Sequence, residues 1–497
     1  MSSTDNGPDG LPSPKQSTGF TQAGGAMRLA AIIAGLIGGL ALGALSEFDG
    51  YLSFPQETGL GWAVFIFATV FMLSAAPGRF TAATVLSVML GVLIGGLTYK
   101  MQHFHSVNDM PVLRYSMTGF WFAVGAPATA YILTVFGLTA IEEKAPRWSY
   151  GRVFHHLFAI PVQILFALAV VALLNVVVWL WSELFEIIGI GIIGEIWEEP
   201  LIWMPMSGAF AGLGVALARQ WTGITSVLRT LCRYVARFAL PIFAAFTVTL
   251  LIALPAQGLE KLFESRSAAG IMSALAAFTI FLVYGARQDL TETPPVWLRL
   301  ATAISVLGLP VYSALAAYAL WLRVDQYGFT PERYVGFVLV VILFLHAAGL
   351  LAVQALDLLR RRGWLPGAGP VNMVVLAVLA GFFIAMHTPP LDPYAVSARS
   401  QFQRLADERA DPAQFDYGYL RFKLGPAGEQ ALERLKGLDS HPGIAVIREQ
   451  IASAETTRNY YEWKRLQRGE ELPRPAPESP AEKRGTEPDK PESQTQG

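Results

Sequence analysis

Residues 154–181 read FHHLFAIPVQILFALAVVALLNVVVWLW, an apolar run that ends at two tryptophans. The hydrocarbon core of a bilayer is about 30 Å thick, and a helix crosses it with about 20 predominantly apolar residues. Tryptophan rings settle at the membrane–water boundary because they are partly apolar and partly polar. The run therefore predicts a helix that crosses a membrane and ends near its surface.

Similar apolar runs recur along the chain and predict an all-α, polytopic transmembrane bundle of about eleven spans. They lie at residues 29–45, 60–75, 82–97, 120–140, 201–218, 234–254, 268–284, 297–321, 334–354 and 371–386. The first of these also fits a cleaved signal peptide. The long polar leader before it and the length of the run favour an uncleaved span.

The overall composition agrees with a membrane protein. Hydrophobic residues make up 53% of the 497 residues and charged residues 15%, which leaves too few polar groups to cover a soluble protein of this size. The formal net charge is -1, so the basic excess of a nucleic-acid-binding protein is missing and no nucleic-acid partner is expected. Cys232 is the single cysteine, which excludes an internal disulfide and a cysteine-based metal site.

Composition also divides the chain into four parts. Residues 1–27 and 469–497 are expected to be disordered tails, because they hold too few large apolar residues to offset the entropy of ordering. Residues 28–387 form the predicted transmembrane helical domain. The apolar pattern ends at His387-Thr388-Pro389-Pro390. Residues 388–468 form a small, mostly helical segment outside the membrane.

Within that extramembrane segment, apolar residues recur at helical spacing in residues 396–406, 428–435 and 444–466. Residues 420–424 alternate instead between apolar and polar side chains, which predicts a short strand. The segment is smaller than a typical domain.

The distribution of Lys and Arg predicts the orientation, because short cytoplasmic loops retain positive charge. Alternate loops carry most of these residues, namely Arg79, Lys144, Arg147, Arg152, Arg219, Arg229, Arg233, Arg287, Arg299, Arg360, Arg361 and Arg362. The N-terminus is therefore expected in the cytoplasm. After an odd number of spans, the C-terminal segment is expected on the other side.

Polar side chains deep in the spans are few. No Asp, Glu, Lys or Arg lies in the central part of any predicted span, which argues against a proton pump or sodium symporter that relays charge through carboxylates. Asn175 and His346 are the deep candidates for a functional site, followed by Gln354. For Asn175 and His346, a hydrogen bond to a neighbouring helix is favoured over titration or ligand binding.

An acidic group surrounds residues 187–194, an apolar and glycine-rich run that is too short to span a bilayer. It could be a re-entrant element that presents carboxylates to a cation or a basic partner. An interfacial helix and turn is favoured instead. The acidic residues are Glu183, Glu186, Glu195, Glu198 and Glu199.

Small residues recur every four positions on single helix faces and predict close helix packing, because lipid supplies no hydrophobic drive between helices. The faces are Gly35, Gly39 and Gly43; Ser87, Gly91 and Gly95; and Gly208 and Gly212. Prolines at positions 127, 161, 205, 241 and 310 are expected to kink their helices.

Familiar catalytic motifs are missing from the sequence. No P-loop, dinucleotide fingerprint, HExxH pair or GxSxG elbow occurs in a supporting context. His103, His105 and Asp109 share one loop, but they suggest no fourth ligand for zinc. We therefore predict no catalytic, cofactor-binding or metal-binding residue, and an enzyme is the less favoured class.

Three stretches resemble a bacterial family of multi-span membrane proteins, domain-of-unknown-function family 4153. They are residues 179–190, WLWSELFEIIGI; residues 323–334, RVDQYGFTPERY; and residues 397–401, SARSQ, continuing through residues 415–422, FDYGYLRF, to Gly425. The resemblance implies a bacterial multi-span membrane protein. Together with the orientation from Lys and Arg, it leads us to expect the inner (plasma) membrane, with the C-terminal segment in the periplasm. It implies no activity and no catalytic residue.

The second of these stretches is also a helix start. Thr330 can cap the following helix, Pro331 suits its first position and Glu332 complements the helix dipole. Charges at Arg323 and Asp325 are expected to pair with those at Arg333 and Glu332. A recognition role for Tyr327 and these charges, in docking the C-terminal segment, is a further hypothesis.

Three functional classes fit the sequence. The number of spans and their prolines favour transport or permeation of a small or lipid-like solute. The alternative is a non-catalytic envelope scaffold or regulatory subunit that binds a protein partner through its C-terminal segment. A membrane-embedded, lipid-modifying enzyme ranks third, on the acidic cluster and the histidines alone.

Overall fold

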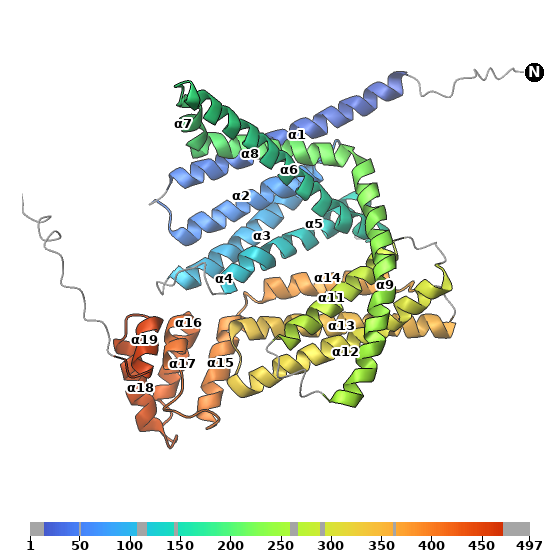
Figure 1. The fold of residues 1–497 in the computed structure, drawn as a ribbon. Helices are drawn as coiled ribbons and strands as arrows, with labels where there is room; N and C mark the ends of the chain where they lie inside the picture. Colours follow the sequence, from blue (N-terminus) through green and yellow to red (C-terminus); the bar gives the residue numbers. More distant parts are fainter. Residues whose placement is uncertain are drawn as a thin grey trace, which may run out of the picture.

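The computed structural model describes residues 14–48, 51–106, 117–143, 148–258, 267–288, 294–360 and 364–470 (Figure 1). Within these residues, eleven helices are long and apolar enough to cross a membrane. The predicted all-α bundle is thus confirmed. A separate group of short helices at the C-terminus stands beside one end of the bundle.

The eleven helices that are long and apolar enough to cross a membrane fall into two groups along the chain. The first group is α1 (Pro14–Glu47), α2 (Phe54–Ser74), α3 (Phe80–Ser106), α5 (Ala126–Glu143), α6 (Tyr150–Ile187) and α8 (Pro200–Gln220). The second is α9 (Thr222–Gln257), α11 (Ala268–Ala286), α12 (Val296–Tyr327), α13 (Pro331–Arg360) and α14 (Ala368–Ala385). Short elements complete the bundle: α4 (Met117–Phe120), the π-helix η1 (Trp121–Gly125) and α7 (Ile192–Glu198).

Close glycine contacts join α1 to α8, the first and sixth spans. A Cβ built on Gly35 would lie 1.9 Å from the Gly208 carbonyl oxygen, and one on Gly39 would lie 2.2 Å from that of Met204. Farther along, Gly43 meets Pro200 in the same way. Numbering rises on α1 as it falls on α8, so the two helices are antiparallel. The predicted glycine faces on these two helices therefore pack against each other.

The third predicted small-residue face joins α2 to α3. A Cβ on Gly91 would lie 2.7 Å from the Ala63 carbonyl oxygen, and one on Gly95 would lie 2.6 Å from that of Gly59. Only glycine permits backbones to approach this closely. Buried apolar side chains then fill the space among the other helices. One core lies across α9 and α11 to α14, a second joins α2, α3 and α5 to α13 and α14, and a third lies among the helices of the first group.

The C-terminal domain consists of five short helices: α15 (Pro393–Ala406), α16 (Tyr417–Lys423), α17 (Gly425–Lys436), α18 (Ile444–Thr456) and α19 (Tyr460–Gln467). They enclose a core of their own that includes Tyr417, Leu420 and Trp463. The strand predicted at residues 420–424 is wrong, because these residues lie in α16 and the turn after it. Asp416 caps α16 by accepting a hydrogen bond from the Tyr419 backbone N–H at 3.0 Å.

Helix α1 begins at Pro14, inside the segment predicted as the N-terminal tail. Pro14 suits a first helical position, and no proline interrupts the sequence that follows. Residues 1–13 and 471–497 of the two predicted tails lie outside the described residues.

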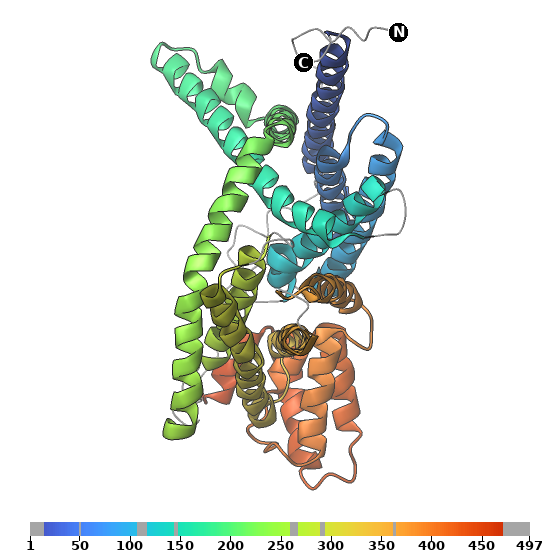
Figure 2. The same ribbon diagram turned by 90° about the vertical axis from the view of Figure 1, so that its right-hand side faces the viewer.

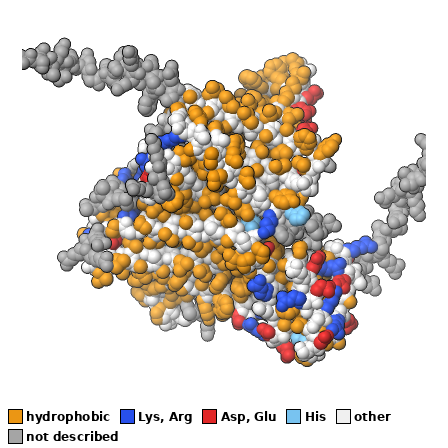
Figure 3. All heavy atoms as spheres, turned by 180° about the vertical axis from the view of Figure 1, so that it is seen from behind, with side chains coloured by type: hydrophobic (Ala, Val, Ile, Leu, Met, Phe, Trp, Pro, Cys, Tyr) orange, Lys and Arg blue, Asp and Glu red, His pale blue; other side chains and the backbone are white. Residues whose placement is uncertain are grey.

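The two ends of the bundle differ in character. We call the end that carries the C-terminal domain the domain side, and the other end the opposite side. Charged side chains gather on the C-terminal domain, whereas hydrophobic side chains cover most of the bundle surface (Figure 3). Seen from the opposite side, α9 lies as a long helix along the edge of the bundle (Figure 2). Its 36 residues make it about 54 Å long, more than the membrane core requires.

Candidate functional site

A groove of about 800 Å³ runs between α1, α2, α6 and α8. Apolar side chains and glycines form nearly all of its wall, including Phe65, Leu168 and Gly208. On α2 the lining extends from Glu57 to Leu73, a rise of about 24 Å along a helix. The groove therefore follows most of the thickness of a bilayer core.

Polar groups line the groove mainly at its mouth on the domain side. Glu57 and Thr58 lie on the first turns of α2, and Ser46 lies near the end of α1. Trp62 and Trp203 stand beside them in the wall. The mouth thus combines a carboxylate, two hydroxyls and two indole rings at the level where lipid meets water.

Arg219 lies beyond the groove on the opposite side. Its guanidinium Nη1 donates hydrogen bonds to the carbonyl oxygens of Met72 at 2.9 Å and Ala75 at 2.8 Å. Arg219 is in the last turn of α8, and the two carbonyls are at the end of α2. Because Met72 itself lines the groove, this arginine ties together two walls where they converge.

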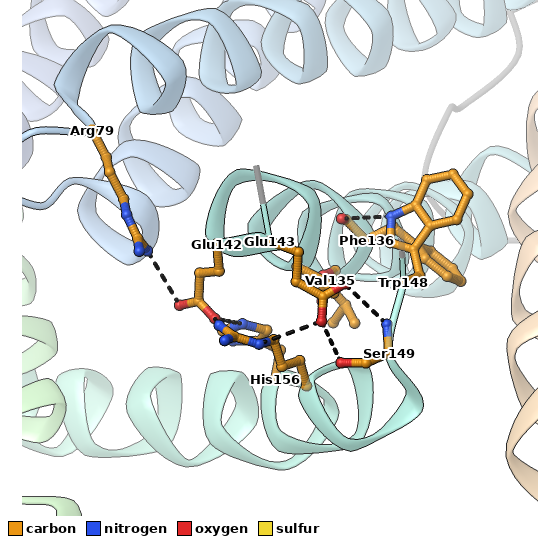
Figure 4. Close-up of polar contacts among 10 residues, drawn as sticks. Arg79, Val135, Phe136, Glu142, Glu143, Trp148, Ser149 and His156 are labelled. Carbon is orange, nitrogen blue, oxygen red and sulfur yellow. Dashed lines mark hydrogen bonds and ion pairs between the residues drawn. The ribbon is translucent and has the colours of Figure 1, made fainter. Parts of the chain in front are cut away.

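An ionic network near Arg219 links three segments (Figure 4). The Glu142 carboxylate on α5 lies 3.7 Å from Arg79 and 3.1 Å from Arg152, and its Oε2 lies 3.2 Å from His156 Nε2. Glu143 pairs with Arg152 at 3.3 Å and accepts a hydrogen bond from the Ser149 backbone N–H at 3.1 Å. The network holds the α2–α3 turn, the end of α5 and the start of α6 in one arrangement.

Asn175 lies next to the groove and joins two of its walls. Its side-chain amide donates to Ser207 Oγ on α8 at 3.2 Å and to the Val171 carbonyl at 2.8 Å. Ser207 and Val171 both line the groove. Asn175 thus makes the interhelical hydrogen bond expected of it.

His346 lies apart from the groove, in the core of the second helix group. Its Nε2 is 2.9 Å from the hydroxyl of Tyr284 on α11, which donates to the Ala368 carbonyl at 3.0 Å. His346 is therefore also hydrogen-bonded to a neighbouring helix. Gln354 lies about two turns farther along α13. Its side-chain oxygen is buried and has no hydrogen-bond partner among the described residues.

The predicted acidic group lies at the tip of the α6–α8 hairpin. Helix α7 packs against α6 and α8 at this tip (Figure 1), and Glu183, Glu186 and Glu195 are exposed there. Ile187 is 82% exposed. This placement at the end of a hairpin fits the interfacial interpretation better than a re-entrant element.

The turn between α12 and α13 contacts the C-terminal domain through its backbone. Arg404 on α15 donates to the carbonyls of Asp325 and Gln326, each at 2.8 Å. Gln401 Nε2 donates to the carbonyls of Tyr327 at 3.0 Å and Phe329 at 3.2 Å. The Tyr327 side chain does not make these contacts; its carbonyl does.

The charges of this turn pair differently from the expectation. The Asp325 carboxylate lies 2.9 Å from Arg409 of the C-terminal domain, and Arg333 donates to the Gly328 carbonyl at 3.1 Å. The guanidinium of Arg333 also lies 5.3 Å from the centre of the Tyr327 ring. Arg323 and Glu332 have no part in the ion pairs of the described residues. The predicted cap is confirmed, because Thr330 Oγ1 accepts from the Arg333 backbone N–H at 3.3 Å.

A second junction with the C-terminal domain lies around His387, two residues after α14, where Lys100 and His387 line a small cavity together with Asp392 and Leu424. The Nδ1 of His387 lies 3.0 Å from the Phe383 carbonyl, and its ring meets Trp121 edge-to-face at 4.3 Å. Lys100 donates to the His387 carbonyl. Burial lowers the pKa of His387 to about 4, so the imidazole is neutral near pH 7.

Sequence reasoning missed Glu57, Arg219 and His387 as site residues. The sequence analysis used Arg219 only as one of the basic loop residues that predict the orientation. Its position in the last turn of a helix was a usable signal, because cations there can bind the last helix carbonyls. Glu57 lies in a first helical turn, where an acidic residue is ordinary. Asp109, one of the three residues of the histidine loop, lies outside the described residues.

Comparisons with known proteins identify the family of the chain. No curated protein and no solved structure matches it. One family model, described as a domain of unknown function (DUF4153), matches residues 34–435, from the first span to α17. That range covers most of the chain, including the groove, both junctions and the three stretches quoted above. The protein is therefore a member of the DUF4153 family of domains of unknown function.

Proposed function

We propose that this protein binds a lipid-like amphiphile in the groove between α1, α2, α6 and α8, and lets it pass along the groove between the two halves of the bilayer. The observation that carries the proposal is the form of the groove. It is long and apolar, it has a polar mouth on the domain side, and an arginine bound to two main-chain carbonyls lies beyond its other end.

The wall chemistry supports an acyl chain as the occupant. Hydrocarbon gains nothing from leaving lipid for an equally apolar wall, so affinity must come from close packing and from the polar mouth. A solute without a long apolar part would leave most of the wall without contact. The absence of charge in the central wall also disfavours ions and small polar solutes.

The experiment fills the groove with one side chain. A Cβ on Gly61 would meet only Leu42 Cδ2, at 3.9 Å, so Gly61→Leu extends into the groove without a backbone clash. Gly96→Leu on α3 is the matched control, because nothing lies within 4 Å of a Cβ there and the residue is exposed outside the groove. Both variants add the same side chain to a membrane-crossing helix.

We expect Gly61→Leu to slow the exchange of a fluorescent lipid between leaflets of reconstituted vesicles several-fold, and Gly96→Leu to leave the rate unchanged. The readout is the fraction of fluorophore that an impermeant reductant can reach over time. Wild-type vesicles that exchange lipid no faster than protein-free vesicles would contradict passage along the groove.

The alternative is an envelope scaffold or regulatory membrane subunit, with a protein partner bound through the C-terminal domain. Its support is that α15 to α19 form a separate core and contact the bundle at two junctions. Loss of cellular function on removing residues 388–470, together with unimpaired function of Gly61→Leu, would favour this alternative.

The proposed location is a bacterial inner membrane, with the N-terminus in the cytoplasm and the C-terminal domain in the periplasm. Arginines gather on the opposite side of the bundle, which supports a cytoplasmic position for that side. They include Arg79, Arg152, Arg219, Arg229 and Arg287. The mouth of the groove would then open at the outer leaflet.

A further inference from the structure

The mouth of the groove has a specific electrostatic character. Glu57 is the one ionisable side chain in its wall within the described part of the chain, and no Lys, Arg or His lines it there. Glu57 is half-buried. No ion pair with Glu57 occurs among the described residues. A ligand head group that reaches the mouth therefore meets a negative charge without a compensating base.

The two hydroxyls of the mouth are also acceptors. Ser46 Oγ already donates its proton to the Gly43 carbonyl at 2.7 Å, and Thr58 Oγ1 donates to the Phe54 carbonyl at 2.7 Å. Each oxygen keeps its lone pairs. Together with Glu57, these groups can accept hydrogen bonds from a ligand but cannot donate any to it.

The indole rings of the mouth also favour a positively charged head group. Trp62 stacks on Phe122 with ring centres 5.6 Å apart, which fixes its plane, and Trp203 is 37% exposed. The faces of indole rings attract cations, and most strongly where water is excluded. An anionic head group would meet repulsion from Glu57 and would find no cationic side chain among the described residues that line the mouth.

We infer that the amphiphile of this groove carries an ammonium or other positively charged amine head group, which binds Glu57 while its chain lies along the apolar wall. This inference rests on the proposed function and specifies its ligand. The head group can belong to an aminophospholipid or to a free long-chain amine, because both present the same N–H donors.

Glu57 also has a simpler role, since a carboxylate in the first turn of α2 stabilises the helix dipole. That role predicts an effect on stability and none on the choice of head group. The two are separable by comparing ligands that differ only in their heads.

The test uses three photoactivatable hexadecyl probes with ammonium, hydroxyl or phosphate head groups. Each is added to the full-length protein in phosphatidylcholine nanodiscs, and labelled peptides are quantified. We expect wild-type protein to be labelled in α1, α2, α6 and α8 most strongly by the ammonium probe and least by the phosphate probe. Glu57→Gln should lose the ammonium preference several-fold and keep its labelling by the hydroxyl probe, which also reports that the groove is intact.

Two control variants separate the possible failures. Glu195→Gln removes an exposed carboxylate on α7 that does not line the groove, and it should change nothing. Gly61→Leu should reduce labelling by all three probes. Equal labelling by the three probes, unaffected by Glu57→Gln, would overturn the head-group inference and leave the groove proposal standing. Absence of groove labelling by every probe would overturn the proposed function itself.

Competition identifies the source of the amine. Excess phosphatidylethanolamine in the nanodisc should displace the ammonium probe if the ligand is an aminophospholipid, whereas displacement by hexadecylamine alone would assign a free long-chain amine. Failure of both competitors would show that the labelling is not a saturable site and would overturn the inference.

Discussion

Among single residues, His387 carries the clearest pH dependence. Its Nδ1 faces the Phe383 carbonyl, and its Nε2 is buried without a hydrogen-bond partner among the described residues. A proton added at Nε2 would therefore be a buried charge without an acceptor, which explains why burial lowers the pKa of His387 to about 4. Lys100 nearby lowers it further, while the backbone contact opposes the shift.

This residue should make the junction weaker in acid. The unfolded imidazole has a pKa of 6.5 and the folded one about 4, so the unfolded state binds more protons between these values. Stability is fully present above about pH 6.5 and is lost as the pH falls toward about 4, by about 3 kcal/mol. His387→Phe keeps the ring but removes the titration.

The measurement is thermal unfolding of both proteins between pH 7.5 and pH 4 in one detergent. We expect the melting temperature of wild type to fall more steeply with acid than that of His387→Phe. Carboxylates elsewhere, including Asp392 beside the junction, titrate in both proteins, so the difference between the two curves isolates the histidine. Parallel curves would refute the assignment.

At this scale, the sequence predicts deep polar residues better than it predicts the groove residues. Asn175 and His346 stand out because polar side chains inside a membrane need partners, and each has one. Glu57 and Arg219 lie near helix ends, where a charged side chain costs little free energy. Their presence there therefore does not indicate a functional site. Arg219 also binds main-chain carbonyls, which every residue possesses, so no partner could be found by residue type.

Among the helices, the contact between α1 and α8 depends most strictly on glycine. Gly35→Leu would place a Cβ 1.9 Å from a main-chain oxygen of Gly208, and the helices must separate to accept it. We expect a loss of about 3 kcal/mol in stability. The measurement is the melting temperature of the purified protein, with Gly96→Leu as the control because its surroundings are open. Equal melting temperatures for the two variants would show that the close packing is not required.

Helix positions were predictable because a span must be long and apolar, a condition that sequence shows directly. The error falls where that condition is absent. Residues 420–424 alternate like a strand, yet the Asp416 cap and the core around Trp463 make them helical.

For the molecule as a whole, docking of the C-terminal domain depends on backbone carbonyls of the α12–α13 turn. Gly328 permits this contact: its φ is +77°, and a Cβ there would lie 2.7 Å from both Arg404 and Gln401. The side chains of Arg404 and Gln401 each donate to two carbonyls of the turn. Hydrogen bonds of this kind are worth about 1 kcal/mol each.

The double variant Gln401→Ala, Arg404→Ala should therefore release the domain. We expect limited proteolysis of the purified protein to cut residues 388–392 faster than in wild type, while α15 to α19 stay folded around their own core. Arg448→Ala is the control, because Arg448 pairs with Asp439 inside the domain. A cleavage rate equal to that of the control would mean that other contacts hold the domain.

Which spans lie side by side could not be predicted at this scale. Glycine spacing identified faces on α1 and α8, but several helices carry such faces, and nothing in the sequence pairs one with another. The groove exists only because α1 crosses α8, more than a hundred residues away. Its ligand-contacting residues were accordingly out of reach, although the lipid-like class of solute was among the expectations.

The pairing of α1 with α8 also has a consequence for biogenesis. Ribosomes deliver the chain from its N-terminus, so α1 enters the membrane well before α8 is synthesised. Until then its glycine face, Gly35, Gly39 and Gly43, is without the helix that covers it. The nascent protein must keep this face from pairing with the wrong span until α8 has entered the membrane.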